Sequence, residues 1–310
     1  MSQLINAILT LFSMITLGII LAKYGLITGP FNQLLSKVLI RAIFPISLFR
    51  SAYTQFQDRS LFSEFKYIFL SFSLIVFAYT VIFVFAKLCH VEPTRLGVTR
   101  AGAVFSNTIF MGLPLATAFL GEVSSLYVIL YFASNTTLFW VLGAYFYDQS
   151  DTSSFSLSKL IGFPLRGFLL GLSLVFLGIH LPDFLLSSVN NVANTATPLA
   201  MLYIGAMFYL TDYKSLRLNR DLGLVIGFKL IVYPLLTLLI LSLPIFDGIP
   251  LLLRQTFCLI SAMPTQNQVA LVAGEKNIHK EYANLLVLST TLISCITIPV
   301  MSTIIMYFLK

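Results

Sequence analysis

Two short polar segments interrupt apolar stretches that are otherwise long enough to form membrane-spanning helices. The first, Ser106–Pro114, holds hydroxyl and amide side chains with a glycine and a proline, and the second, Ala262–Gln268, holds a proline, a threonine and three amides. A proline removes a backbone donor, and its ring collides with the preceding helical turn. In hydrocarbon, freed backbone groups are tolerated only where they face protein or a water-filled cavity. The segments therefore predict two broken helices at a functional site.

Each break would expose the N-terminus of a half-helix, where backbone N–H groups and the helix dipole favour an anion. Amide and hydroxyl side chains nearby can donate further hydrogen bonds, so a carboxylate suits the set. The alternative is that the amides only join neighbouring helices. The candidate binding residues are Ser106, Asn107, Thr108, Gly112, Pro114, Pro264, Thr265, Gln266 and Asn267, with Asn135, Thr136, Ser289 and Thr290 from other spans.

The charged residues favour an anion site over a cation site. All twelve acidic residues fall in expected loops or at span ends, whereas buried carboxylates mark proton relays and cation sites. An antiporter built on an intramembrane aspartate pair is therefore disfavoured, although sodium could still bind to carbonyls and amides. Arg41 and Lys229 are expected to lie deepest in their spans. They could attract an anionic substrate, or they could snorkel to the headgroups.

No pattern of catalytic or metal-binding residues is found. The three histidines fall in loops without HExxH spacing, and the three cysteines, Cys89, Cys258 and Cys295, form no CxxC pair. We therefore expect no enzyme activity, no catalytic residue, no metal and no cofactor. The formal net charge of +7 is spread without a long basic block, so we expect no nucleic-acid partner.

Composition predicts an all-α integral membrane protein. The 310 residues are 58% hydrophobic and 10% charged, where soluble domains carry about 25% charged residues. Apolar runs of about 20 residues have the length of a membrane-spanning helix, and alternating barrel patterning is absent. Ten spans are predicted, at about 4–22, 33–53, 66–87, 98–119, 124–146, 162–180, 185–210, 221–243, 250–273 and 282–308.

The distribution of Lys and Arg predicts the orientation. Loops after the odd-numbered spans hold twelve of these residues, and the opposite loops and termini hold three. Because cytoplasmic loops are enriched in Lys and Arg, both termini are expected outside the cytoplasm. The fourth and ninth spans then run in opposite directions, so their breaks could meet antiparallel.

The two halves of the chain carry matching landmarks. Pro45 and Pro198 are 153 residues apart, and Pro114 and Pro264 are 150 apart. Chance is the alternative, since other spans also contain prolines. The spacing favours an inverted five-helix repeat, residues 1–147 and 159–310, joined by a polar cytoplasmic linker, 148–158. Broken helices at matching positions of such repeats point to the binding site of a secondary transporter.

Several motifs resemble the auxin efflux carrier family, which includes plant PIN proteins and bacterial carriers of malate or malonate. Asn107–Pro114 resembles the family's N-T-x-x-[FM]-G-[IL]-P element, and the remaining matches extend along essentially the whole chain. They are Gly25–Leu26, Phe44–Pro45, Thr197–Ala200, Ile204–Ala206, Ala262–Pro264, Leu288–Thr290 and Ile298–Pro299.

The resemblance implies an elevator fold like that of NhaA-type antiporters and bile-acid symporters. Helices 4 and 9 would cross at Pro114 and Pro264, helices 1, 2, 6 and 7 would form a scaffold, and helices 3–5 and 8–10 would move. A homodimer through the scaffold is implied. The segment between helices 5 and 6 is short, unlike the long loop of plant members, and the amide-rich turn after Pro264 departs from their pattern.

The sequence thus predicts a secondary carrier of a small organic anion, a mono- or dicarboxylate such as malate, in the cell membrane. An auxin-like aromatic carboxylate efflux carrier and a non-transporting membrane ligand sensor are the alternatives.

Overall fold

The computed structural model describes residues 2–57, 59–143, 163–210, 220–275 and 278–310. The predicted linker at 148–158 lies outside these residues. The described chain is mostly helical and has no named strand. Its α-helices largely coincide with the ranges expected from hydropathy, with ends that differ by a few residues, and the 3-10 helix Arg59–Tyr67 lies mainly between two expected spans. The number of membrane crossings stays a prediction.

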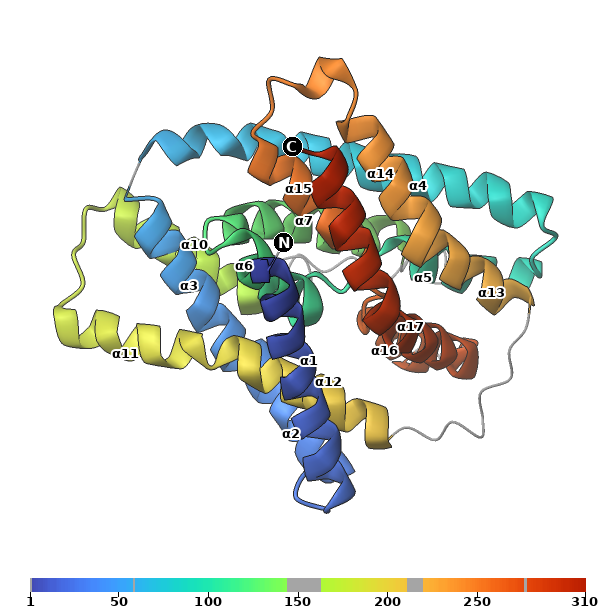
Figure 1. Cartoon of the computed structure of the whole chain (residues 1–310), viewed down its shortest axis with the longest axis horizontal. Coiled ribbons are helices and arrows are strands. Elements are labelled where there is room, and N and C mark those ends of the chain that lie inside the picture. The colour runs from blue at the N-terminus through green and yellow to red at the C-terminus, as the bar shows by residue number, and fades with distance from the viewer. Residues whose placement is uncertain (1, 58, 144–162, 211–219, 276–277) are drawn as a thin grey trace. The chain divides into compact units, whose positions relative to one another are not determined.

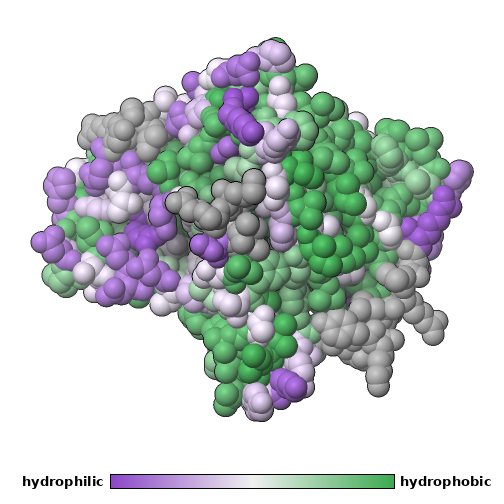
Figure 2. Space-filling model, in the orientation of Figure 1, coloured by the Kyte–Doolittle hydropathy of each residue, from purple (hydrophilic) through white to green (hydrophobic). Residues whose placement is uncertain are grey.

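Three helical stretches have the length and composition to cross a membrane in the described part of the chain: Ser63–Leu88, Arg220–Leu241 and Lys280–Phe308. Shorter apolar helices occur at Phe12–Lys23, Thr108–Leu120, Phe163–Phe176 and Leu251–Ser261. Large hydrophobic side chains are exposed on many helices, and hydrophobic residues cover much of the surface in Figure 2. Lipid contact accounts for such exposure, since the bilayer core replaces water as the solvent of these faces.

The chain forms two compact units. Unit 1 comprises residues 1–65, 109–129 and 161–213, and unit 2 comprises residues 66–108, 130–160 and 214–310. Helix α7 (Ser124–Leu138) contains one boundary between them. The helices of unit 1 are α1 (Ser2–Lys23), α2 (Gly29–Val38), α3 (Phe44–Gln55), α6 (Leu113–Leu120), α10 (Phe163–Phe176), α11 (Asp183–Asn194) and α12 (Ala196–Leu210).

Glycines allow two pairs of helices in unit 1 to pack backbone against backbone. Helix α1 crosses α12, and α3 lies along α10 (Figure 1). A Cβ on Gly205 would lie 2.0 Å from the carbonyl oxygen of Ile15, and one on Gly167 would lie 2.0 Å from that of Pro45. Small residues serve this purpose in membrane helices because association there depends on close packing.

Unit 2 is built around the C-terminal helix. Helix α17 contacts α5, α13, α15 and α16, and α14 packs on α15. The helices of this unit are α4 (Ile68–Leu88), α5 (Leu96–Val104), α13 (Arg220–Gly227), α14 (Tyr233–Leu241), α15 (Leu251–Ser261), α16 (Gln268–Glu275) and α17 (Lys280–Phe308).

Three prolines follow widened helical turns and do not end their helices. Five-residue π-helical segments end two residues before Pro45, Pro114 and Pro234. A proline lacks the N–H of a regular turn and crowds the carbonyl four residues back, and a π-turn accommodates both effects. The interruption in the fourth predicted span therefore lies at Phe105–Asn107, ahead of the π-helical segment Thr108–Gly112, and the chain is helical through Pro114.

Candidate functional site

The two interrupted segments meet as a short antiparallel pair within unit 2. Residues Ser106 and Thr265 form an isolated antiparallel bridge. On either side, the N–H of Asn107 donates to the carbonyl of Pro264 at 2.8 Å, and the N–H of Gln266 donates to the carbonyl of Phe105 at 3.0 Å. The sequence-based expectation that these interruptions meet antiparallel is confirmed. The pairing satisfies backbone groups that the broken helices leave open.

Asn135 of α7 holds the two segments together from the side. Its Oδ1 accepts from the N–H of Ser106 at 3.1 Å, and its Nδ2 donates to the carbonyl of Ser106 at 3.3 Å and to Oε1 of Gln266 at 3.0 Å. Asn135 and Ser106 are fully buried. The structure therefore joins three of the candidate residues, from three separate spans, in one hydrogen-bonded cluster.

Two of the candidate residues carry a polar atom without a partner. Nε2 of Gln266 and Oγ1 of Thr136 are buried and have no hydrogen-bond partner among the described residues. A buried donor without a partner costs about 1–3 kcal/mol. Each such group in a native protein needs an explanation, and a ligand-binding role is one.

Several other candidates have their polar groups occupied by the protein. The N–H of Thr265 donates to Oγ1 of Thr290 at 3.2 Å, and Oγ1 of Thr265 donates to the carbonyl of Gly102 at 2.6 Å. The hydroxyl of Ser289 donates to the carbonyl of Leu285 in its own helix at 2.5 Å. The hydroxyls of Thr265 and Thr290 therefore join the interruption to α5 and α17, whereas that of Ser289 bonds only within α17.

The remaining candidates divide between the two units. Asn107 and Thr108 are buried in unit 2, and Asn267 is half-buried there. Gly112 and Pro114 are buried residues of unit 1. Arg41 also belongs to unit 1, is exposed, and places its guanidinium 5.6 Å from the ring centroid of Phe163.

Lys229 is fully buried beside the interruption of unit 2. Its ammonium donates to the carbonyl of Val104 at 3.1 Å, to Oγ of Ser106 at 2.6 Å and to the carbonyl of Ser261 at 3.2 Å. It also lies 4.8 Å from the ring centroid of Tyr233. An ammonium has three N–H donors, so this set of acceptors is complete.

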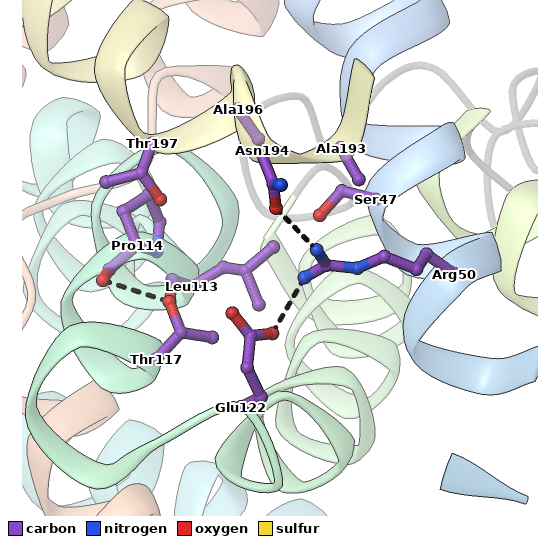
Figure 3. A pocket seen from close by; sticks show the side chains of 10 residues that line it. All are labelled: Ser47, Arg50, Leu113, Pro114, Thr117, Glu122, Ala193, Asn194, Ala196 and Thr197. Carbon is purple, nitrogen blue, oxygen red and sulfur yellow. Dashed lines mark hydrogen bonds and ion pairs between the residues drawn. The ribbon is translucent and has the colours of Figure 1, made fainter. Parts of the chain in front are cut away.

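A separate polar cavity of about 100 Å³ lies within unit 1, between α3, α6 and the junction of α11 with α12. Arg50 projects into it and donates to Oδ1 of Asn194 at 2.7 Å and to Oε2 of Glu122 at 2.8 Å (Figure 3). Arg50 is not among the candidate residues named from the sequence. Because Glu122 neutralises its charge, this cavity has no excess charge to attract an anion.

No group of three or more His, Cys, Asp or Glu side chains is close enough to hold a metal ion within the described ranges. The polar groups that the interruption gathers are instead amides, hydroxyls and one ammonium, with no buried carboxylate among the described residues. Such a donor-rich set can bind an anion by hydrogen bonds and charge.

Comparisons with known proteins agree with a transporter. A model of the family described as "Membrane transport protein" matches residues 3–156 and 152–302. The chain is 29% identical over 208 residues to the "Putative malonate transporter" of Rhizobium meliloti (strain 1021). This alignment covers 64% of the chain and 63% of the relative, so the chain matches less than two thirds of the relative's length. It is 23% identical over 302 residues to an "Uncharacterized transporter" of Methanothermobacter thermautotrophicus (strain Delta H), with 96% and 97% covered. The chain belongs to the membrane transport protein family, which is the auxin efflux carrier family that its motifs resemble.

Proposed function

We propose that this membrane transporter is a secondary carrier of a small carboxylate, which binds at the paired interruption of unit 2. The buried, unpaired Nε2 of Gln266 beside the Ser106–Thr265 bridge is the observation that carries the proposal. A carboxylate there would accept the hydrogen bond that the protein leaves unmade, and Oγ1 of Thr136 would donate a second. Hydrogen bonds to a charged acceptor are about twice as strong as neutral ones.

Malonate is the first substrate to test. The relative named as a malonate transporter supports this choice, as does the lack of any buried acidic side chain among the described residues. A dicarboxylate or monocarboxylate of similar size presents the same acceptor oxygens. The family is a class of transporters rather than of enzymes, so the ligand is expected to cross the membrane unchanged.

The proposed mechanism is an elevator movement in a ten-helix inverted repeat. Unit 1 holds the predicted helices 1, 2, 6 and 7 with the second part of 4 and the first part of 5, while unit 2 holds helices 3, 8, 9 and 10 with the rest of 4 and 5. This division supports unit 1 as the scaffold and unit 2 as the moving part. A homodimer through the scaffold, the cell membrane as location, and termini outside the cytoplasm complete the proposal.

Counterflow of radiolabelled malonate in proteoliposomes tests the proposal. We expect uptake by the parent protein and a several-fold or larger loss in Thr136→Val, which removes only the unpaired hydroxyl. Thr237→Val is the matched control, because the buried Thr237 hydroxyl donates to the carbonyl of Tyr233 within its own helix at 3.0 Å. A contribution of about 1–3 kcal/mol corresponds to a loss of roughly five- to hundredfold in affinity.

Two results would contradict the proposal. The first is a parent protein that binds malonate but produces no counterflow, which is the behaviour of a ligand sensor. The second is equal malonate uptake by Thr136→Val and Thr237→Val, which would place the substrate elsewhere. Competition by an aromatic carboxylate but not by malate would point to the auxin-like alternative.

A further inference from the structure

The acceptors around the ammonium of Lys229 have the composition of a cation site. Two are carbonyls at the C-terminal ends of α5 and α15, Val104 and Ser261, and the third is the hydroxyl of Ser106 between the half-helices. The last four carbonyls of a helix have no partner within it, and the helix dipole is negative at that end. Two such ends therefore converge on one point in the interior of unit 2.

Carriers with broken helices use carbonyls and half-helix C-termini of this kind to coordinate a coupling sodium ion or proton. In this protein the ammonium of Lys229 already occupies the groups that could coordinate such an ion. The ammonium is fully buried, and all three of its N–H groups are used. None of the ion pairs found among the described residues includes Lys229, so its charge is balanced by dipoles and not by a carboxylate.

We propose that Lys229 is a built-in cation, which fills the place of a coupling sodium ion and makes transport independent of sodium. The inference rests on the proposed function for its transport readout. It also has a consequence for the fold, since one ammonium holds together the ends of two half-helices that are far apart in the sequence. That second consequence can be measured without any substrate.

The parent protein gives the first test. Malonate counterflow is measured in sodium chloride and in choline chloride at the same pH and ionic strength. We expect rates that agree within about twofold, because the acceptors that could hold sodium are occupied. A rise of about tenfold or more on adding sodium would overturn the proposal, since coupling to a transported ion requires such a dependence.

Variants at Lys229 give the second test. Lys229→Met keeps the aliphatic stem and removes the charge, and Lys87→Met, on an exposed lysine of the same unit, is the control. We expect Lys229→Met to lower malonate uptake by about tenfold or more, because three charge-assisted hydrogen bonds are lost, and to lower the melting temperature. Lys87→Met should retain both. Wild-type uptake and melting by Lys229→Met would overturn the proposal.

Chemical rescue gives a readout that does not need transport. Lys229→Ala leaves the carbonyls of Val104 and Ser261 without their donor and opens space for a small cation. We expect methylammonium chloride to raise the melting temperature of purified Lys229→Ala above its value in choline chloride, with no such difference in the parent or in Lys229→Met. Equal melting of Lys229→Ala in the two salts would overturn the cation site. Absence of malonate transport in a parent protein that passes the rescue test would instead count against the proposed substrate.

Discussion

Replacing Gln266 with methionine should remove ligand binding with little or no loss of fold stability. Methionine matches the length of the side chain and removes both the oxygen and the NH2 of the amide. The change eliminates the unpaired Nε2, whose burial costs about 1–3 kcal/mol, and sacrifices the bond from Asn135 to Oε1, worth about 0.5–1.5 kcal/mol net. The difference lies between a loss of about 0.5 and a gain of about 2.5 kcal/mol. A residue kept only for stability would behave in the opposite way.

The assay is thermal unfolding of the purified protein in detergent, with and without malonate. A change of 1 kcal/mol moves the melting temperature of a protein of 150–250 residues by about 2–4 °C. We therefore expect Gln266→Met to melt between about 2 °C below and 10 °C above the parent, since the gain is at most about 2.5 kcal/mol. Malonate should raise the melting temperature of the parent by mass action and should leave that of the variant unchanged.

Gln255 supplies the matched control. Its Nε2 donates to the carbonyl of Leu309 at 2.9 Å, so Gln255→Met loses a made hydrogen bond and should destabilise the protein by about 1 kcal/mol. The malonate response should survive this change. The reasoning is refuted if Gln266→Met is destabilised as much as Gln255→Met and still responds to malonate.

Three further outcomes are expected. Gly205→Ala should cost about 1–3 kcal/mol by overpacking α12 against α1, while Gly223→Ala, where a methyl group meets nothing within 4 Å, should be neutral or stabilising; thermal unfolding compares the two. Glu122→Gln should lower the free energy of unfolding by at most about 1 kcal/mol, because Glu122 is 67% exposed in its pair with Arg50. High salt should reduce this difference from the parent. Thr265→Val should cost about 1 kcal/mol by removing its hydroxyl's bond to α5, and a stability equal to the parent's would contradict this.

Hydropathy and residue type could predict the helix positions and the antiparallel interruption. They could not locate the break, because sequence alone does not say whether a proline ends a helix or widens it. At Pro114 the preceding turn becomes π-helical and the chain continues. The break instead follows Val104, where no proline stands. Its position depends on pairing with Pro264 and Thr265, which are more than 150 residues away.

The role of a side chain at the site could be predicted only where its partner is also a side chain whose residue type indicates the interaction. The hydroxyl of Ser289 donates to a carbonyl of its own helix. This bond depends on the side-chain rotamer, which the residue type does not reveal. The depth of Lys229 could be predicted, but its partners include two backbone carbonyls, which no residue type reveals. Arg50 was missed because Glu122 and Asn194 are 72 and 144 residues away from it.

The buried ammonium and the unpaired amide belong to one cluster, and their connection bears on the charge of the ligand. Lys229 bonds the hydroxyl of Ser106, Ser106 bonds Asn135 through its backbone, and Asn135 bonds Gln266. No acidic side chain described in the structure is buried, so the ammonium of Lys229 is balanced in this cluster by carbonyl and hydroxyl dipoles and by no carboxylate. Taking an anion out of water is costly unless an opposite charge and hydrogen bonds receive it. For a carboxylate, this cluster offers both an opposite charge and hydrogen-bond donors. For a neutral solute it offers only the hydrogen-bond donors, and for a cation it offers neither.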